Sequence, residues 1–243
     1  MSDPDPARYG QAWAAVYDDV HGHLDPAAAV DRLYELAAGG PALELGIGTG
    51  RVAIPLAARG VAVHGIDASE AMLERLREKP GGAAIPVTLG DFAGVAVEGQ
   101  FALVYVVFST IFGLASQGAQ VACFRNVAAR LAPGGVFVIE AFIPDIARFD
   151  RHQRVHVHRI EPGRVDAALT IHDPVAQRII SQHVTLTDGN VRLLPAELRY
   201  AWPSELDLMA QLAGLRLRER CAGWQRAPLT ANSPTHVSIY ERA

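Results

Sequence analysis

Residues 41–67 constrain the fold of this chain more than any other segment. An apolar run ends in Glu44 and then breaks into three glycines at alternate positions, Gly46, Gly48 and Gly50. A helical pattern follows, and a second apolar run ends in Asp67. Strand, glycine turn, helix and strand fit within the length of one βαβ unit. Glycines suit such a turn because they accept positive φ and let the backbone approach a ligand closely.

The spacing of these glycines discriminates between two classes of adenosine-containing ligand. A dinucleotide fingerprint reads Gly-x-Gly-x-x-Gly and places a pyrophosphate over a helix N-terminus. Here Arg51 stands where the third glycine is expected, and Glu44 lies two residues before the first glycine. A carboxylate there would repel a pyrophosphate but can pair with an ammonium group, which S-adenosylmethionine (SAM) carries. The pattern therefore favours SAM, with Asp67 placed to accept the ribose hydroxyls.

With this motif the chain resembles the class I SAM-dependent methyltransferases, whose first motif is the same acid and glycine triplet. Strand and helix patterns alternate along the chain. The strands are predicted at about 41–45, 61–66, 85–89, 101–107 and 136–141, and the helices at about 50–59, 69–79 and 117–131. This alternation predicts an α/β fold with a doubly wound, mostly parallel sheet. The resemblance implies seven strands ending in an antiparallel hairpin, predicted over 215–224 and 236–242.

Between 154 and 200 the pattern changes to alternating, β-branched runs separated by turn signals such as Asp188-Gly189-Asn190. An inserted antiparallel β meander is predicted there, followed by a helix over 204–213 capped by Ser204. Three regions result. They are an N-terminal helical cap over 1–38, a SAM-binding Rossmann-like core over 39–146 and 202–243, and the β insert over 147–201, acting as substrate cover or dimer contact.

Composition limits the partners of the chain. Its 243 residues are half apolar and one-fifth charged, as is usual for a soluble globular protein. The net charge of −4, with no basic run, argues against a nucleic-acid partner. Without an apolar run of eighteen residues or a signal peptide, neither membrane insertion nor export is predicted. The expected protein is therefore cytoplasmic, binds a small molecule, and forms a possible homodimer through the exposed edge of the insert.

The resemblance also implies which residues hold SAM. Glu44, with the backbone of Gly46 and Gly48, would hold the methionine end, and Asp91 would accept the exocyclic amine of adenine. Phe92 and Met72 would flank the adenine ring. The complete predicted cofactor set is Glu44, Gly46, Ile47, Gly48, Gly50, Asp67, Ala68, Met72, Gly90, Asp91, Phe92 and Val107.

Methyl transfer from a sulfonium requires alignment and exclusion of water more than an obligatory acid–base pair. If the nucleophile arrives protonated, Glu140 is the first candidate base because strand C-termini line the ligand crevice of open α/β sheets. Tyr17 is a second candidate, and the histidines of the insert are others. The predicted substrate pocket comprises Trp13, Tyr17, Phe108, Ser109, Phe112, Phe142 and Tyr200. His156 and His158 share one strand face, but no metal site is predicted from this pair.

A closer but looser likeness is to the bacterial sugar-amine N-methyltransferases, which carry an antiparallel β insert. Tyr17, in Val-Tyr-Asp, matches a tyrosine at the active-site mouth of those enzymes, whereas Gly113 falls where their pattern places a histidine. The predicted function is SAM-dependent methylation of an oxygen, nitrogen or carbon atom of a small organic molecule. The alternatives are a non-catalytic SAM-binding regulatory domain, an NAD-dependent oxidoreductase, which Arg51 and Glu44 disfavour, and a peptide or protein methyltransferase.

Overall fold

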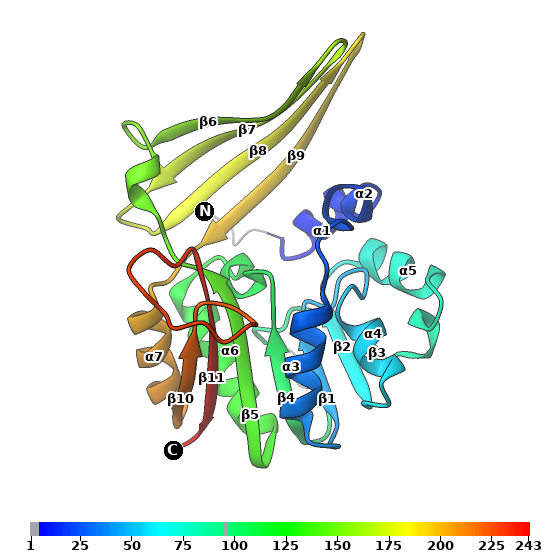
Figure 1. The fold of residues 1–243 in the computed structure, drawn as a ribbon, viewed down its shortest axis with the longest axis vertical. Coiled ribbons are helices and arrows are strands. Elements are labelled where there is room, and N and C mark those ends of the chain that lie inside the picture. The colour runs from blue at the N-terminus through cyan, green and yellow to red at the C-terminus, as the bar shows by residue number, and fades with distance from the viewer. Residues whose placement is uncertain (1–4, 95–96) are drawn as a thin grey trace.

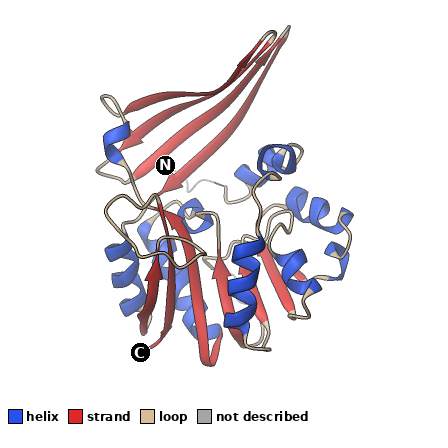
Figure 2. Cartoon of the chain, viewed as in Figure 1, coloured by secondary structure: helices blue, strands red, loops and turns tan. Residues whose placement is uncertain are grey.

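Two sheets organise the chain (Figures 1 and 2). The structure, a computed structural model, describes residues 5–94 and 97–243, so the first four residues of the predicted cap lie outside it. A seven-stranded sheet with helices on both faces forms the larger body, and a four-stranded sheet extends away from it.

The seven-stranded sheet has the predicted topology. Its strands are β1 (Ala42–Leu45), β2 (Val63–Asp67), β3 (Val87–Leu89), β4 (Phe101–Val106), β5 (Leu131–Phe142), β10 (Leu215–Cys221) and β11 (Thr235–Arg242). Their order is β10-β11-β5-β4-β1-β2-β3, and β11 runs antiparallel to both of its neighbours. The mostly parallel sheet that ends in an antiparallel hairpin is therefore confirmed.

Helices cover both faces of this sheet. They are α1 (Arg8–Trp13), α2 (Tyr17–His21), α3 (Ala27–Ala37), α4 (Ala53–Ala58), α5 (Glu70–Glu78), α6 (Gln117–Arg130) and α7 (Pro203–Leu212), with the short 3-10 helices η1 (Gly82–Ala84), η2 (Thr110–Gly113) and η3 (Ile146–Arg148). The strand β1 is buried on both sides because its side chains alternate between two cores. Leu43 packs in the core that contains α6 and α7, and Ala42 in the core that contains α3, α4 and α5.

Element boundaries differ from the predictions where local backbone chemistry decides them. Ser69 caps α5 as predicted, since its Oγ accepts the Met72 N–H at 3.4 Å. Helix α7 begins at Pro203, so the predicted cap at Ser204 is wrong; a proline fits the first helical turn, where its missing N–H is not needed. Strand β5 begins at Leu131, earlier than the predicted start at about 136, with a register shift opposite β4.

The predicted β insert is present between β5 and α7. It consists of β6 (Gln153–Glu161), β7 (Arg164–Asp173), β8 (Arg178–Thr187) and β9 (Asn190–Arg199), paired antiparallel in that order. Figure 1 shows its distal end projecting away from the core sheet, while β9 returns toward it. The antiparallel meander is thereby confirmed.

The two faces of the insert differ in their surroundings. Paired residues of an antiparallel ladder lie on the same face. On one face Leu194 is buried in a cluster with Trp13 and Met72. The opposite face is apolar and exposed; its large aliphatic side chains are Val155, Val157, Ile160, Leu169, Ile171, Ile180, Leu186, Val191 and Leu193. We call this set the outer face.

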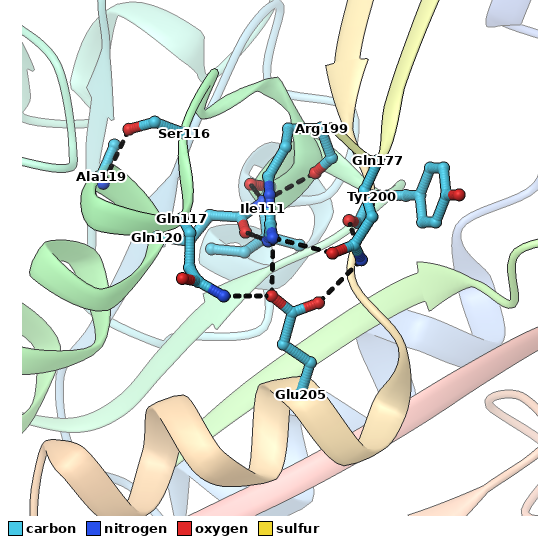
Figure 3. A network of polar contacts seen from close by, with 9 residues as sticks. All are labelled: Ile111, Ser116, Gln117, Ala119, Gln120, Gln177, Arg199, Tyr200 and Glu205. Carbon is cyan, nitrogen blue, oxygen red and sulfur yellow. Dashed lines mark hydrogen bonds and ion pairs between the residues drawn. The ribbon is translucent and has the colours of Figure 1, made fainter. Parts of the chain in front are cut away.

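A buried polar network attaches the base of the insert to the core helices (Figure 3). Arg199, at the end of β9, donates to Glu205 of α7 at 2.6 Å and to Gln120 of α6 at 2.6 Å. Gln177, from the turn before β8, accepts from Arg199 at 3.1 Å and donates to Glu205 at 2.8 Å. One guanidinium therefore joins the insert to two helices that lie on the same face of the large sheet.

Candidate active site

A cavity of about 670 Å³ lies at the carboxyl ends of the parallel strands. Its wall is formed by the turn after β1, the ends of β2 and β5, η2, the helices α1 and α2, and the base of β9. Open α/β sheets bind ligands at this edge, and the volume is in the range of small-molecule sites. Segments far apart in the sequence therefore enclose one ligand-sized space.

The glycine turn requires glycine for two different reasons. Gly46, Gly48 and Gly50 all have left-handed φ, of 70°, 55° and 79°. A Cβ on Gly46 would lie 2.4 Å from Thr110 Cγ2, and one on Gly50 would lie 2.3 Å from Leu76 Cδ1. A Cβ on Gly48 would meet no described atom within 4 Å. Gly46 and Gly50 thus allow close packing, whereas Gly48 leaves bare backbone facing open space in the cavity wall.

Asp67 lines the cavity and holds the glycine turn in place. Its Oδ2 accepts the Gly48 N–H at 2.8 Å, and its Oδ1 accepts the Ser69 N–H at 2.9 Å. Burial raises the pKa of Asp67 above its usual value, and these backbone N–H groups oppose that rise. Each carboxylate oxygen retains further acceptor capacity, so Asp67 can also accept ligand hydroxyls.

The wall beyond Asp67 is suited to a flat ring. Ala68, Met72, Asp91 and Phe92 all line the cavity. Asp91 accepts the Ala93 N–H at 2.8 Å through Oδ1, which leaves Oδ2 for another donor. These features fit SAM. Asp67 is suited to ribose hydroxyls, Gly48 offers bare backbone, and Asp91 lies beside apolar side chains.

Comparisons with known proteins identify the family. A family model described as a methyltransferase domain matches residues 42–135. The cypemycin N-terminal methyltransferase of Streptomyces sp is 27% identical over 98% of this chain and 99% of that protein. The CcbJ methyltransferase structure from Streptomyces caelestis is 41% identical, with a TM-score of 0.93, and the match covers 99% of this chain and 100% of that chain. This chain belongs to the SAM-dependent methyltransferases.

More distant methyltransferases share the fold. The sugar N-methyltransferase KedS8 from Streptoalloteichus sp ATCC 53650 is 21% identical with a TM-score of 0.69, covering 94% of this chain and 93% of that chain. The predictions of SAM as cofactor and of methylation of a small molecule are confirmed by the family. The family assignment also decides against the oxidoreductase alternative.

Seven predicted site residues of the methyltransferase lie outside the cavity wall: Glu44, Ile47, Gly50, Gly90, Val107, Phe112 and Tyr200. Phe112 and Tyr200 correct the predicted substrate pocket, because both side chains are buried in the core. Phe112 packs edge-on against Phe142, a wall residue, with ring centroids 4.9 Å apart. The Tyr200 hydroxyl is hydrogen-bonded to His172 at 2.9 Å. The Phe112 ring therefore supports the wall from behind.

Glu44 lies beneath the glycine turn. It is buried, and its Oε2 accepts the Tyr105 hydroxyl at 2.9 Å. Burial raises the pKa of Glu44 to about 8, although the Tyr105 hydrogen bond and the Arg51 charge oppose the rise. At pH 7 this carboxyl is therefore mostly protonated, and its pairing with a ligand ammonium group stays a prediction.

Glu140 lines the cavity and fixes the loop after β4. Its Oε2 accepts the Phe108 N–H, and its Oε1 accepts the Trp224 indole N–H, both at 2.9 Å. Phe108 and Ser109 both have left-handed φ, 57° and 61°, which is costly for residues other than glycine. The Glu140 hydrogen bonds help to hold this strained loop at the cavity. Its role as a base stays a prediction.

The aromatic side of the methyltransferase cavity contains two histidines, His21 and His183, that the sequence alone does not single out. Trp13 stacks against His21 of α2, with ring centroids 5.7 Å apart, and meets His183 of β8 edge-on at 5.0 Å. All three line the cavity together with Tyr17. His21 follows Tyr17 by one helical turn, so a prediction that Tyr17 faces the cavity implies the same for His21. His183 has no comparable signal, because a distant strand carries it.

The charge state of these histidines follows from their surroundings. Burial, with the charge of Arg51 and the neighbouring imidazoles of His183 and His23, lowers the pKa of His21 to about 4. Burial, with the neighbouring His158, also lowers the pKa of His183 below its usual value. Both imidazoles are therefore neutral at pH 7 and can accept hydrogen bonds through a ring nitrogen.

Two further properties concern the described residues only. In 5–94 and 97–243, no group of three or more His, Cys, Asp or Glu side chains is arranged to hold a metal ion. Among the helices of these same residues, none has the length and apolar character needed to cross a membrane.

Proposed function

We propose that the methyl acceptor is the nitrogen atom of an amine on a small organic molecule. The similarity to an N-terminal methyltransferase over 98% of the chain supports nitrogen as the acceptor. A sugar N-methyltransferase and an amino pentose methyltransferase share the fold, and both names indicate amine substrates. The net charge of −4 supports a small molecule over a nucleic acid.

The observation that carries this proposal is the pair of neutral imidazoles, His21 and His183, on the cavity wall. An alcohol must lose its proton to a base as it attacks, and an imidazole whose pKa is about 4 is too weak for that task. A neutral amine attacks with its own lone pair and needs only orientation. Neutral imidazoles can orient it by accepting its N–H hydrogens.

Different residues around the cavity bind the cofactor, exclude water and position the loop after β4. SAM, when bound, supplies a methyl group on a sulfonium. Asp67 and the Gly48 backbone hold the nucleoside side of the site, and Trp13 and Phe108 form apolar walls that exclude water. Glu140 keeps the Phe108 loop in position. The part of the insert at Pro195 covers the cavity, since its carbonyl accepts the Trp13 indole N–H at 2.8 Å.

A paired acceptor panel tests this proposal. Each ring compound is supplied once as a primary amine and once as the matching alcohol, for example cyclohexylamine and cyclohexanol. We expect S-adenosylhomocysteine and an N-methyl product, detected by mass spectrometry, only with amines. Methylation of the alcohols without the amines would contradict the proposal. The variant Glu140→Gln, measured in the same assay, tests the role of Glu140. If Glu140 is a base, this variant should bind SAM normally but lose turnover. If turnover is retained, Glu140 only holds the loop after β4.

We also propose that the outer face of the insert pairs two copies of the chain. The prediction placed this contact at the sheet edge, but the nine exposed aliphatic side chains gather on the face. Strand spacing and rise give a four-stranded face of ten-residue strands an area of roughly 600 Å². Two such faces would bury about 1,200 Å², the lower end of the range for stable interfaces.

The oligomeric state in solution tests this pairing. We expect the protein to sediment as a dimer at micromolar concentration and the double variant Leu169→Lys, Leu193→Lys to sediment as a monomer, because burying the new charges is costly. Val175→Lys is a matched control, since this valine is 94% exposed in the turn between β7 and β8. A monomeric wild-type protein, or a variant that still dimerises, would contradict this interface.

A further inference from the structure

We propose that Arg51 anchors the carboxylate of the methionine moiety of SAM. Arg51 directly follows Gly50, at the end of the turn whose Gly48 backbone lines the cavity. It occupies the position where a dinucleotide-binding turn has glycine. The inference concerns cofactor binding alone and does not depend on the identity of the acceptor.

One ring contact and two electrostatic interactions place the Arg51 guanidinium beside the cavity. It lies 4.4 Å from the centre of the Phe108 ring, within the range of a cation–π interaction. Its charge lowers the pKa of His21 and also acts on the Tyr17 hydroxyl. Phe108, His21 and Tyr17 all line the cavity. The guanidinium is therefore bordered by wall residues from α2 and from the loop after β4.

Within the described chain the Arg51 charge has no anionic partner. Its Nε is buried without a hydrogen-bond partner, and no carboxylate of residues 5–94 or 97–243 forms an ion pair with it. Arg199 and Arg220 differ from Arg51, since Arg199 pairs with Glu205 at 2.6 Å and Arg220 pairs with Asp207 at 2.5 Å. A buried donor or cation without a partner is unfavourable, so this geometry indicates an anionic ligand.

The nearby acid Glu44 does not supply that anion. Its Oε2 accepts the Tyr105 hydroxyl, and with its pKa raised to about 8 it is mostly neutral at pH 7. SAM carries a single carboxylate, at its methionine end. A planar guanidinium matches a carboxylate with two parallel hydrogen bonds. Asp67, at the end of β2, would thus hold the ribose, and Arg51, after the glycine turn, would hold the carboxylate.

Isothermal titration with three ligands tests the assignment. S-adenosylhomocysteine has the carboxylate, decarboxylated SAM keeps the ammonium but lacks the carboxylate, and 5′-methylthioadenosine lacks both groups. For Arg51→Met we expect S-adenosylhomocysteine to bind roughly 10- to 100-fold more weakly, because a charge-assisted hydrogen bond is lost. The affinities for decarboxylated SAM and 5′-methylthioadenosine should change by less than about threefold, since neither ligand offers the charged partner.

Two further variants make the result specific. Arg51→Lys keeps the charge but not the planar pair of donors, so it should recover part of the S-adenosylhomocysteine affinity. Arg59→Met is the matched control, because Arg59 lies at the other end of α4, pairs with Asp31 and packs on Tyr34. Thermal unfolding without ligand verifies folding of each variant. Equal losses for all three ligands, or an unchanged S-adenosylhomocysteine affinity in both Arg51 variants, would overturn the proposal.

Discussion

Replacing Glu205 with alanine is expected to lower the free energy of unfolding by about 3–5 kcal/mol, the cost of leaving a buried charge without its partner. Glu205 accepts from Arg199, Gln177 and Gln117 at 2.6–2.8 Å. The Arg199 side chain is only 7% exposed, so water cannot replace the lost carboxylate. Urea unfolding followed by circular dichroism measures the change.

Two comparisons separate this network from an ordinary ion pair. Arg199→Met combined with Glu205→Ala should recover part of the loss, because it removes the isolated charge as well. Glu241→Ala breaks the pair with Arg216, whose side chain is 66% exposed, and should cost less than about 1 kcal/mol. A Glu205→Ala effect as small as that of Glu241→Ala would show that the network does not hold the insert.

The same pair makes stability depend on pH. Burial by itself raises the pKa of Glu205, but hydrogen bonds from Gln177, Arg199 and Gln117 outweigh it and leave the pKa below its usual value. A lowered carboxyl pKa contributes stability that is complete above the unfolded-state value of about 4.3. That contribution is lost as the pH falls through the folded-state pKa. Stability of Glu205→Ala should therefore fall less steeply in acid than that of the wild-type protein.

Local patterns were sufficient to predict most of the fold. Phe101–Val106 reads as a doubly buried strand because each of its faces meets a helix layer, and the glycine triplet predicts the turn after Leu45. The insert followed from its alternation and its Asp-Gly-Asn turn, which lies between β8 and β9 as expected. The predicted starts of α7 and β5 differ from the observed starts at Pro203 and Leu131. A single helical turn decides the first, and a register shift decides the second.

The wall of the site was less predictable because distant segments build it. Trp13 reaches the cavity through a hydrogen bond to Pro195, 182 residues away, and the same contact brings His183 to the site. Sequence periodicity carries no information about such a pairing. Phe112 was predicted at the cavity for a related reason. Phe112 and its neighbour Phe142 are both aromatic, and only packing decides which of them lines the cavity.

The nucleoside side of the site was predictable because motif spacing places it. Glycine turn, second strand and acid belong to one βαβ unit, so Gly48 and Asp67 meet at 2.8 Å although 19 residues separate them. The role predicted for Glu44 stays a prediction, because its side chain is buried beneath the turn and accepts from the Tyr105 hydroxyl. Neighbouring side chains of β1 lie on opposite faces of the sheet. Because both faces are buried, the sequence pattern does not reveal on which face Glu44 lies.

Asp67→Ala is expected to weaken the binding of SAM by roughly 1.5–3 kcal/mol, because charged acceptors of the ribose hydroxyls are lost. The Gly48 and Ser69 N–H groups would lose their acceptor as well, so the unliganded variant should also unfold at a lower temperature. Isothermal titration and thermal unfolding measure the two effects separately. Asp67→Asn keeps one acceptor oxygen and should retain part of both.

The choice of ligand distinguishes Asp67 from Arg51. Because 5′-methylthioadenosine keeps the ribose, Asp67→Ala should weaken its binding as strongly as that of S-adenosylhomocysteine, whereas Arg51→Met should spare it. If Asp67→Ala left both affinities unchanged, Asp67 would serve only to hold the Gly48 and Ser69 backbone, and the ribose would have to be bound elsewhere on the wall. Weaker binding of both ligands by Asp67→Ala, together with a loss confined to S-adenosylhomocysteine in Arg51→Met, would assign the ribose to Asp67 and the methionine carboxylate to Arg51.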